Sequence, residues 1–327
     1  MGNKSQHAAR RVVVLGTGGT IAGRASSAQD NIGYVAGQVG VSDLVAGIDV
    51  PDGIALVAEQ VAQVDSKDME FAIWCELAKR CAHWLAEPDV AGIVITHGTD
   101  TLEETAYFLH RVLRADKPVV VTCAMRPSTA VSPDGPVNVR DAIAVAATEG
   151  ARGVVAVCAR TVHAAADVQK VHTYRLDAFS SGDAGPVGFV EEGHVRLVRP
   201  WPDDIGPSAI AIERLASAAE APRVEIVVSH ANARPWLIDA LVSERLAGVP
   251  HAAQGLILAA TGNGTLHHEI EAAAKRAQEA GVSVLRATRC VDGRILFKPA
   301  DTIPDAGALS PVKARIALLL DILSAES

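Results

Sequence analysis

Two threonines on glycine-rich turns are the residues of this chain best suited to chemistry. Thr20 lies in residues 16–23 (GTGGTIAG), and Thr99 lies in residues 96–101 (THGTDT). A threonine hydroxyl is a weak nucleophile until a neighbouring group accepts its proton, and its branched Cβ leaves the side chain few rotamers. The two turns therefore predict a site for nucleophilic chemistry at a hydroxyl.

Each turn directly follows an apolar run. Residues 12–15 (VVVL) precede the first turn, and residues 92–95 (GIVI) precede the second. Unbroken apolar runs of this length are typical of parallel strands buried on both faces. Each threonine then lies just past the carboxyl end of a central strand, where open α/β sheets build their ligand crevice. We expect both hydroxyls to face one pocket.

A helix is predicted directly after the second turn, over residues 101–113. Apolar side chains recur there at helical spacing, and Thr101 and Glu104 have the spacing of a capping box. The positive end of the helix dipole and its free backbone N–H groups would face a carboxylate or an oxyanion held beside Thr99.

The glycines of the first turn also allow a nucleotide-binding interpretation. The run lacks the spacing GxGxxG, because Ile21 occupies the position of the last glycine, and it lacks the GK[S/T] ending of a P-loop. A dinucleotide-dependent oxidoreductase is therefore an alternative that the spacing disfavours.

Length and composition limit the class of protein. With 327 residues, the chain exceeds the roughly 250–300 residues at which single cores stop growing, so two domains are expected. The formal net charge of -8 without basic runs argues against nucleic acid or an anionic membrane as a major partner. No apolar stretch reaches the length of about 20 residues that a membrane-spanning helix needs.

The cysteines and the N-terminus indicate the cytoplasm. The five cysteines are Cys75, Cys81, Cys123, Cys158 and Cys290. An odd number without CxxC spacing suits reduced thiols that fill the core better than disulfides or a zinc site, and no metal is predicted. The polar residues 1–11 and the short apolar stretch after them do not form a signal peptide.

Strand-like and helical segments alternate along the chain. Residues 119–122 and 154–158 read as strands with a helix over 138–148 between them, which is the rhythm of a doubly wound sheet. We predict a larger N-terminal, doubly wound, mostly parallel α/β domain over residues 1–200. A proline-rich linker with a short helix at 209–219 is expected over residues 201–222, before a smaller C-terminal α/β domain over 223–327.

Three segments of this sequence closely resemble the bacterial-type L-asparaginases and glutaminase-asparaginases. They are residues 17–23 (TGGTIAG), 96–106 (THGTDTLEETA) and 124–129 (AMRPST). The resemblance continues in order through residues 134–138 (DGPVN), 167–170 (DVQK) and 262–264 (GNG), and so covers nearly the whole chain.

The resemblance implies hydrolysis of L-asparagine to L-aspartate and ammonia through an acyl-enzyme, with side activity on L-glutamine and no cofactor. By this resemblance Thr20 is the nucleophile, and Tyr34 on a flap is the partner of its hydroxyl. Thr99, Asp100 and Lys170 form the other half of the site. A nearby carboxylate favours the ammonium form of a lysine, so we expect Lys170 to act as proton relay or electrostatic support rather than as a simple base.

The resemblance also implies how the substrate is bound. Asp100 takes the α-ammonium and Ser66 takes the α-carboxylate. The substrate-binding residues expected are Gly19, Ser66, Lys67, Gly98, Thr99, Asp100, Ala124 and Asn263. Members of the family assemble as homotetramers of tight dimers, so we expect the Asn263 region to reach the site of a neighbouring subunit.

The sequence departs from the family pattern near the substrate. Lys67 replaces a glutamine, residues 286–294 contain no glutamate, and Thr265 stands where members carry Asn or Ser. A further cation and one fewer anion would favour amides whose α-amino group is absent or acylated.

Two further alternatives are an asparagine-binding sensor without activity and a subunit of a tRNA-dependent amidotransferase. The presence of both threonines, Asp100 and Lys170 disfavours the sensor. The short segment before the first predicted strand disfavours the amidotransferase subunit, which usually carries an added N-terminal domain.

Overall fold

A computed structural model describes residues 10–202, 215, 220–296, 298–299 and 301–325. The chain forms two compact units that divide between residues 212 and 213, and each unit is described by itself. The predicted linker and its helix at 209–219 lie almost wholly outside the described residues. The domain limits at residues 200 and 223 therefore stay predictions.

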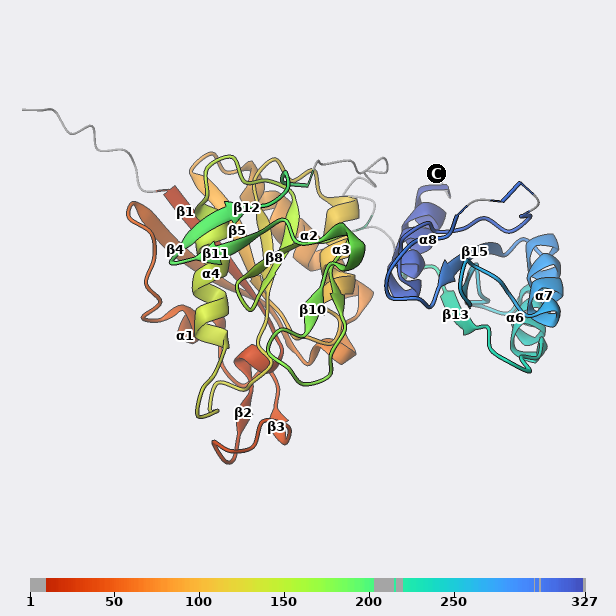
Figure 1. Ribbon diagram of the computed structural model, residues 1–327, viewed down its shortest axis with the longest axis horizontal. Helices are drawn as coiled ribbons and strands as arrows, with labels where there is room; N and C mark the ends of the chain where they lie inside the picture. The colour runs from red at the N-terminus through yellow and green to blue at the C-terminus, as the bar shows by residue number, and fades with distance from the viewer. Residues whose placement is uncertain (1–9, 203–214, 216–219, 297, 300, 326–327) are drawn as a thin grey trace, which may run out of the picture. The chain divides into compact units, whose positions relative to one another are not determined.

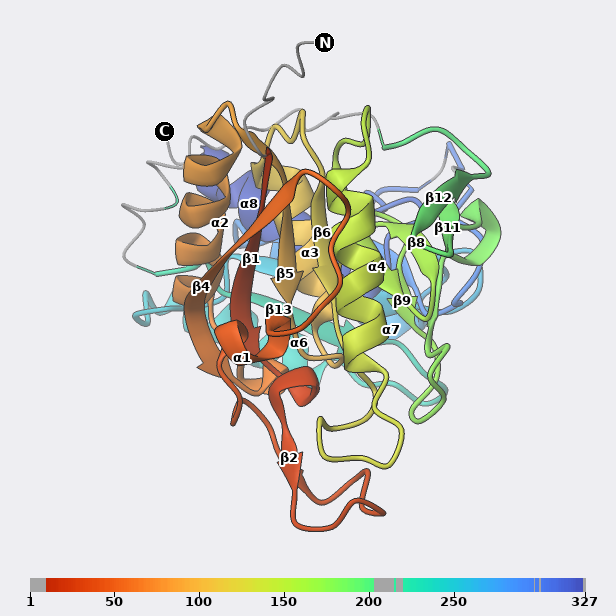
Figure 2. The same ribbon diagram turned by 90° about the vertical axis from the view of Figure 1, so that its left-hand side faces the viewer.

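The larger unit is built on an eight-stranded sheet with the order β12-β11-β8-β7-β6-β5-β1-β4 (Figures 1 and 2). Five strands run parallel: β1 (Arg10–Gly18), β4 (Ile54–Val64), β5 (Val90–Thr96), β6 (Val119–Thr122) and β7 (Val154–Cys158). Three antiparallel strands extend one edge: β8 (Thr161–Ala164), β11 (Gly188–Glu191) and β12 (His194–Leu197). The mostly parallel sheet of the prediction is confirmed.

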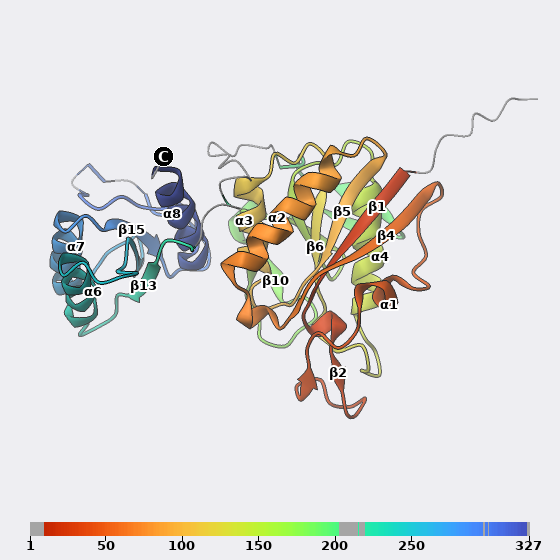
Figure 3. The ribbon, with the colours of Figure 1, turned by 180° about the vertical axis from the view of Figure 1, so that it is seen from behind.

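Helices cover both faces of this sheet, which explains its apolar strands. Helices α2 (Phe71–Ala86) and α3 (Leu102–Val112) pack together on one face, and α1 (Val41–Val45) and α4 (Gly135–Ala147) lie on the other (Figures 2 and 3). The side chains of residues 12–15 alternate between the two faces and are all fully buried. Burial on both faces is what an unbroken apolar strand requires.

Several predicted boundaries shift. Helix α4 begins at Gly135, three residues before the predicted start, with a proline in its first turn, where the missing N–H costs nothing. The capping box predicted for α3 does not form, because the Thr101 hydroxyl donates to the carbonyl oxygen of Ser66 at 2.7 Å instead. Cys290 is exposed, whereas the other four cysteines are buried as expected.

The smaller unit has a parallel three-stranded sheet with the order β13-β14-β15 (Figures 1 and 3). Its strands are β13 (Val224–Val228), β14 (Gly255–Ala260) and β15 (Ser283–Thr288), and its helices are α6 (Trp236–Leu246), α7 (His268–Glu279) and α8 (Pro311–Ala325). Trp236, at the start of α6, is 74% exposed and so is not a core residue of this unit. Among the helices of the described residues, none combines the length and hydropathy needed to cross a membrane.

Candidate active site

The two glycine-rich turns lie against each other at the carboxyl ends of β1 and β5. These strands are parallel neighbours, with Gly16 opposite Thr96. A Cβ atom on Gly19 would lie 2.3 Å from both the Cα and the N of Gly98, and Gly19 has a φ of +79°. Only a glycine fits this approach and this backbone conformation without strain. The structure thus brings the two turns together, and the expectation that both hydroxyls face one pocket stays a prediction.

Tyr34 supplies the neighbour of the Thr20 hydroxyl. Thr20 is buried at the start of a short 3₁₀ helix (Thr20–Ala22), and its Oγ1 lies 2.6 Å from the Oη of Tyr34. Tyr34 lies on β3 (Tyr34–Val35), which pairs with β2 (Arg24–Ala25) in a hairpin that extends below the sheet in Figures 1 and 2. The two hydroxyls are close enough to share a proton.

Lys170 joins Thr99 and Asp100. It lies on β9 (Gln169–Lys170), which pairs with β10 (Phe179–Ser180). Its Nζ donates to the Oγ1 of Thr99 at 2.8 Å and forms an ion pair with the Oδ1 of Asp100 at 2.6 Å. In this arrangement the Lys170 Nζ bridges the Thr99 hydroxyl and the Asp100 carboxylate.

Glu103 is a residue of the site that the sequence reasoning missed. Its Oε2 accepts the backbone N–H of Lys170 at 2.8 Å. Glu103 belongs to the first turn of α3, directly after the Thr99 turn. It therefore connects the strand that carries Lys170 to the helix that follows Thr99. No pattern in the sequence pairs two residues so far apart.

Ser66 lies beneath the second turn and is only 2% exposed. Its Oγ accepts the backbone N–H of Asp100 at 3.2 Å. This N–H is thus engaged within the protein, contrary to the expectation that the N–H groups at the start of α3 are free. The hydroxyl hydrogen of Ser66 remains a donor, which is what a substrate carboxylate would need.

Lys67 is held by two carboxylates of its own turn. Its Nζ lies 2.6 Å from Oδ2 of Asp65 and 3.2 Å from Oδ2 of Asp68, and these hydrogen bonds raise the pKa of Lys67. The Lys67 side chain is 60% exposed. Its charge is therefore balanced locally rather than presented alone to the site.

Asp134 holds the backbone of the residues that follow Ala124. The Asp134 carboxylate accepts the backbone N–H of Met125 at 2.9 Å and that of Arg126 at 3.0 Å. In a trans peptide the C=O points opposite to the N–H, and the described chain has no cis peptide bond. The Ala124 carbonyl is therefore directed away from Asp134. Asp134 lies in a segment that carries the family resemblance, but the resemblance assigns it no role.

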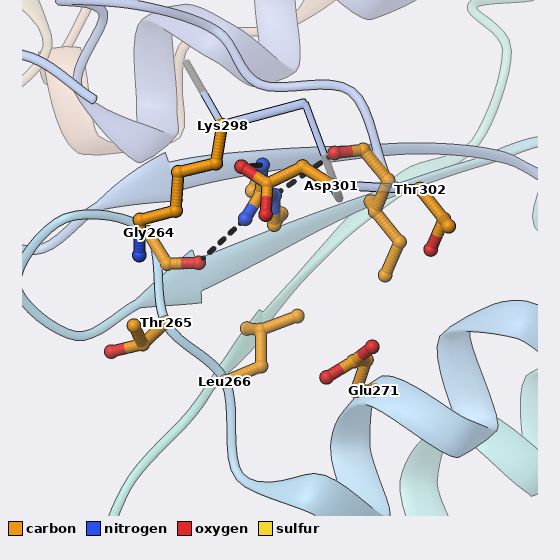
Figure 4. A pocket seen from close by; sticks show the side chains of 9 residues that line it. Gly264, Thr265, Leu266, Glu271, Lys298, Asp301 and Thr302 are labelled. Atoms are coloured by element: carbon orange, nitrogen blue, oxygen red, sulfur yellow. Dashed lines mark hydrogen bonds and ion pairs between the residues drawn. The ribbon is translucent and has the colours of Figure 1, made fainter. Parts of the chain in front are cut away.

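Asn263 lies in the smaller unit, where its amide is engaged by the backbone. Its Nδ2 donates to the carbonyl of Leu296 at 3.1 Å, and its Oδ1 accepts the Leu296 N–H at 2.7 Å. The next residue, Gly264, borders a pocket of about 180 Å³ (Figure 4). There the buried Arg286 donates to the Gly264 carbonyl at 3.0 Å and forms an ion pair with Asp301 at 2.9 Å. Arg286 thus fixes the turn that presents Asn263.

Both units of the chain match models of known protein families. Residues 11–202 match the family model described as "Asparaginase, N-terminal", and residues 223–325 match "Glutaminase/Asparaginase C-terminal domain". The chain is 38% identical to L-asparaginase 2 of Bacillus subtilis over 94% of this chain and 81% of that protein. It is 37% identical to glutaminase-asparaginase of Pseudomonas fluorescens over 93% of this chain and 84% of that protein.

A solved structure supports the same assignment. The crystal structure of a probable cytoplasmic L-asparaginase from Campylobacter jejuni matches with a TM-score of 0.86 and 35% identity. The match covers 96% of this chain and 95% of the other. The fold, the two glycine-rich turns and the similarity along nearly the full length agree, and the chain belongs to the asparaginase family.

Proposed function

We propose that this protein is an L-asparaginase that converts L-asparagine to L-aspartate and ammonia, with L-glutamine as a slower substrate. The observation that carries the proposal is the pair of threonine hydroxyls on neighbouring strand ends, each with its own polar partner. Thr20 has Tyr34 at 2.6 Å, and Thr99 has Lys170 at 2.8 Å. Relatives named L-asparaginase and glutaminase-asparaginase support the substrate class.

In the first half of the reaction, Thr20 is the nucleophile. Its Oγ1 forms a bond to the carbonyl carbon of the side-chain amide while Tyr34, whose Oη lies 2.6 Å away, accepts the Thr20 proton and passes its own hydroxyl proton to the amide nitrogen. The C–N bond then breaks, and the amide nitrogen leaves as ammonia with that proton. The product of this step is an ester between the substrate acyl group and Thr20.

In the second half, water hydrolyses this ester. A water oxygen bonds to the acyl carbon, the bond to Thr20 breaks, and Thr20 regains its proton. Lys170 acts as proton relay and positive charge, because its ammonium is already paired with Asp100 at 2.6 Å and donates to Thr99. An ammonium donor near a developing oxyanion stabilises the transition state.

The substrate is recognised by both turns and by Ser66. Asp100 is 54% exposed, and its second carboxylate oxygen can receive the α-ammonium while Oδ1 is bound to Lys170. Ser66 donates its hydroxyl hydrogen to the α-carboxylate. The backbone of Gly19, Gly98 and Ala124 completes the site, with the Ala124 carbonyl available to accept an amide N–H.

We also propose a cytoplasmic homotetramer, a dimer of dimers in which the Asn263 region reaches the site of a neighbouring subunit. The engagement of Asn263 by Leu296 supports a rigid presentation of this turn. Light scattering on the purified protein tests the assembly, and cell fractionation tests the location. A monomer that hydrolyses asparagine at the full rate would contradict the shared site.

A hydrolase of N-substituted or otherwise modified amides is the second candidate. Lys67 adds a cation next to Ser66, although Asp65 and Asp68 balance it. Ammonia release from L-asparagine, L-glutamine, D-asparagine and N-acetyl-asparagine, with Thr20→Ala as control, separates the two. Fastest release from L-asparagine, abolished by Thr20→Ala, is expected. Release only from the acylated amide would favour the second candidate, and binding without release would favour an asparagine sensor.

A further inference from the structure

The hairpin that carries Tyr34 is fastened to the loop between β6 and α4. In Figure 2 this loop lies beside the hairpin at the lower edge of the unit. The Ser128 backbone N–H and its hydroxyl both donate to the Gly23 carbonyl, at 3.0 and 2.8 Å. The Val131 N–H donates to the carbonyl of Ala28 at 3.2 Å. The loop therefore follows the hairpin from its base toward its tip.

One contact of this loop reaches the residue directly opposite Tyr34. Ala25 is the cross-strand partner of Tyr34, and its backbone N–H donates to the Oγ1 of Thr129 at 2.9 Å. This N–H points out of the hairpin, so Thr129 supplies the acceptor that a third strand would otherwise provide. The loop itself is anchored at its base, where Asp134 accepts the Met125 N–H. Thr129 thus connects a fixed point of the unit to the strand pair that carries Tyr34.

We propose that Thr129 is a positioning residue that sets the distance between the Tyr34 hydroxyl and Thr20. The inference rests on the proposed function, in which Tyr34 receives the Thr20 proton. Thr129 acts only through Ala25 and the hairpin. Without its oxygen, the Ala25 N–H loses its acceptor, and among the described residues the loop keeps its contacts to the hairpin through Ser128 and Val131. The 2.6 Å contact between Thr20 and Tyr34 is then formed for less of the time.

The first test compares Thr129→Val with Thr129→Ser. Valine keeps the shape of the side chain but removes the acceptor, and serine keeps the oxygen. We expect Thr129→Val to lower kcat about tenfold, the order of one lost hydrogen bond, with KM unchanged, and Thr129→Ser to restore the rate. Ser27→Ala is the matched control, because the hydrogen bonds of the Ser27 hydroxyl to described residues lie within the hairpin, to Gln29. Equal rates for Thr129→Val and wild type would overturn the proposal.

A double-mutant cycle with Tyr34→Phe shows whether Thr129 works through Tyr34. If it does, adding Thr129→Val to Tyr34→Phe costs no further activity. If the two losses multiply, Thr129 acts by another route and the proposal is wrong. This cycle has a readout that a general loss of stability would not mimic, because a merely destabilised protein loses activity in both backgrounds.

A measurement without substrate keeps the inference separate from the proposed function. Hydrogen exchange of a peptide spanning residues 24–35 reports the opening of the hairpin directly. We expect about tenfold faster exchange of this peptide in Thr129→Val than in Ser27→Ala, with exchange in β1 and β5 unchanged. Unchanged exchange would overturn the positioning role even if the enzyme proved to act on another amide.

Discussion

The backbone of Gly98 occupies the space that a side chain on Gly19 would need. The two residues belong to different turns, yet the Cα of Gly98 lies 2.3 Å from the position of a Cβ on Gly19. Both turns directly follow central strands of a packed sheet, so the two turns cannot move far apart. The spacing of the two threonines is therefore set by contact between two residues that have no side chain.

Gly19→Ala should inactivate the enzyme. The added Cβ forces the turns apart, and overpacking of this kind costs about 1–3 kcal/mol in addition to backbone strain. Gly150→Ala is the matched control, because Gly150 has a φ of +76° but nothing within 4 Å of its Cβ position. Ammonia release and urea unfolding of both variants separate packing from strain. Equal activity losses in the two variants would contradict the packing argument.

Lys170→Met should lower kcat by at least about a hundredfold, because the Thr99 hydroxyl loses its donor and Asp100 loses its counter-charge. Lys275→Met removes a lysine from an exposed ion pair with Glu271 on α7 and should leave kcat unchanged. Steady-state kinetics of both variants check this. A small effect of Lys170→Met would remove Lys170 from the proposed mechanism.

The stability of the protein should fall as the solution becomes acidic, in part because of His97. Its Nδ1 bonds to the Gly98 carbonyl and its Nε2 to Thr105, and burial lowers the pKa of His97 to about 4. An unfolded histidine has a pKa near 6.5, so the unfolded state binds the proton first and stability is lost between about pH 6.5 and pH 4.

Between pH 7 and pH 5 this single group should cost roughly 2 kcal/mol of unfolding free energy. Urea unfolding of wild type and His97→Gln at both pH values checks the prediction, and the variant should show a smaller change between them. The comparison cancels the carboxylates that titrate in both proteins. An identical change in both proteins would mean that His97 does not titrate in this way.

Lys67→Gln should lower KM for L-asparagine about twofold without changing kcat. Lys67 stands near the substrate ammonium in the proposed binding mode, but Asp65 and Asp68 already compensate its charge. Exposed ion pairs are worth about 0–1 kcal/mol, which limits the effect. The difference between wild type and variant should shrink at high salt. A tenfold or larger change in KM would show that Lys67 touches the substrate.

The sequence predicted the central strands and both turns because their signals are local. Residues 12–15 and 92–95 are apolar throughout, and the turns behind them carry their glycines in the sequence itself. Strand β4 was missed although it is a long strand beside β1. Glu59 interrupts its apolar pattern, and only the fold reveals that Arg80 and Trp84 satisfy this carboxylate.

The residues of the candidate site also fall into a part that the sequence predicts and a part that it does not. Thr20 and Thr99 each follow the carboxyl end of a predicted parallel strand. The sequence alone therefore predicts that both lie at the same edge of the sheet. The contact of Lys170 with Glu103, and that of Thr129 with Ala25, join backbone to side chains across long stretches of chain. Such contacts depend on how the loops pack against the sheet, and the hydrophobic periodicity of the sequence does not predict them.

The contact between Lys170 and Thr99 spans 71 positions of the chain. Domains form as units during synthesis, with the N-terminal part emerging first. A nascent chain on the ribosome could therefore display Thr20, Tyr34 and Thr99 well before Lys170 leaves the exit tunnel. In the proposed mechanism, the Thr99 half of the site therefore stays incomplete until residue 170 has left the exit tunnel, even when Thr20 and Tyr34 have already emerged.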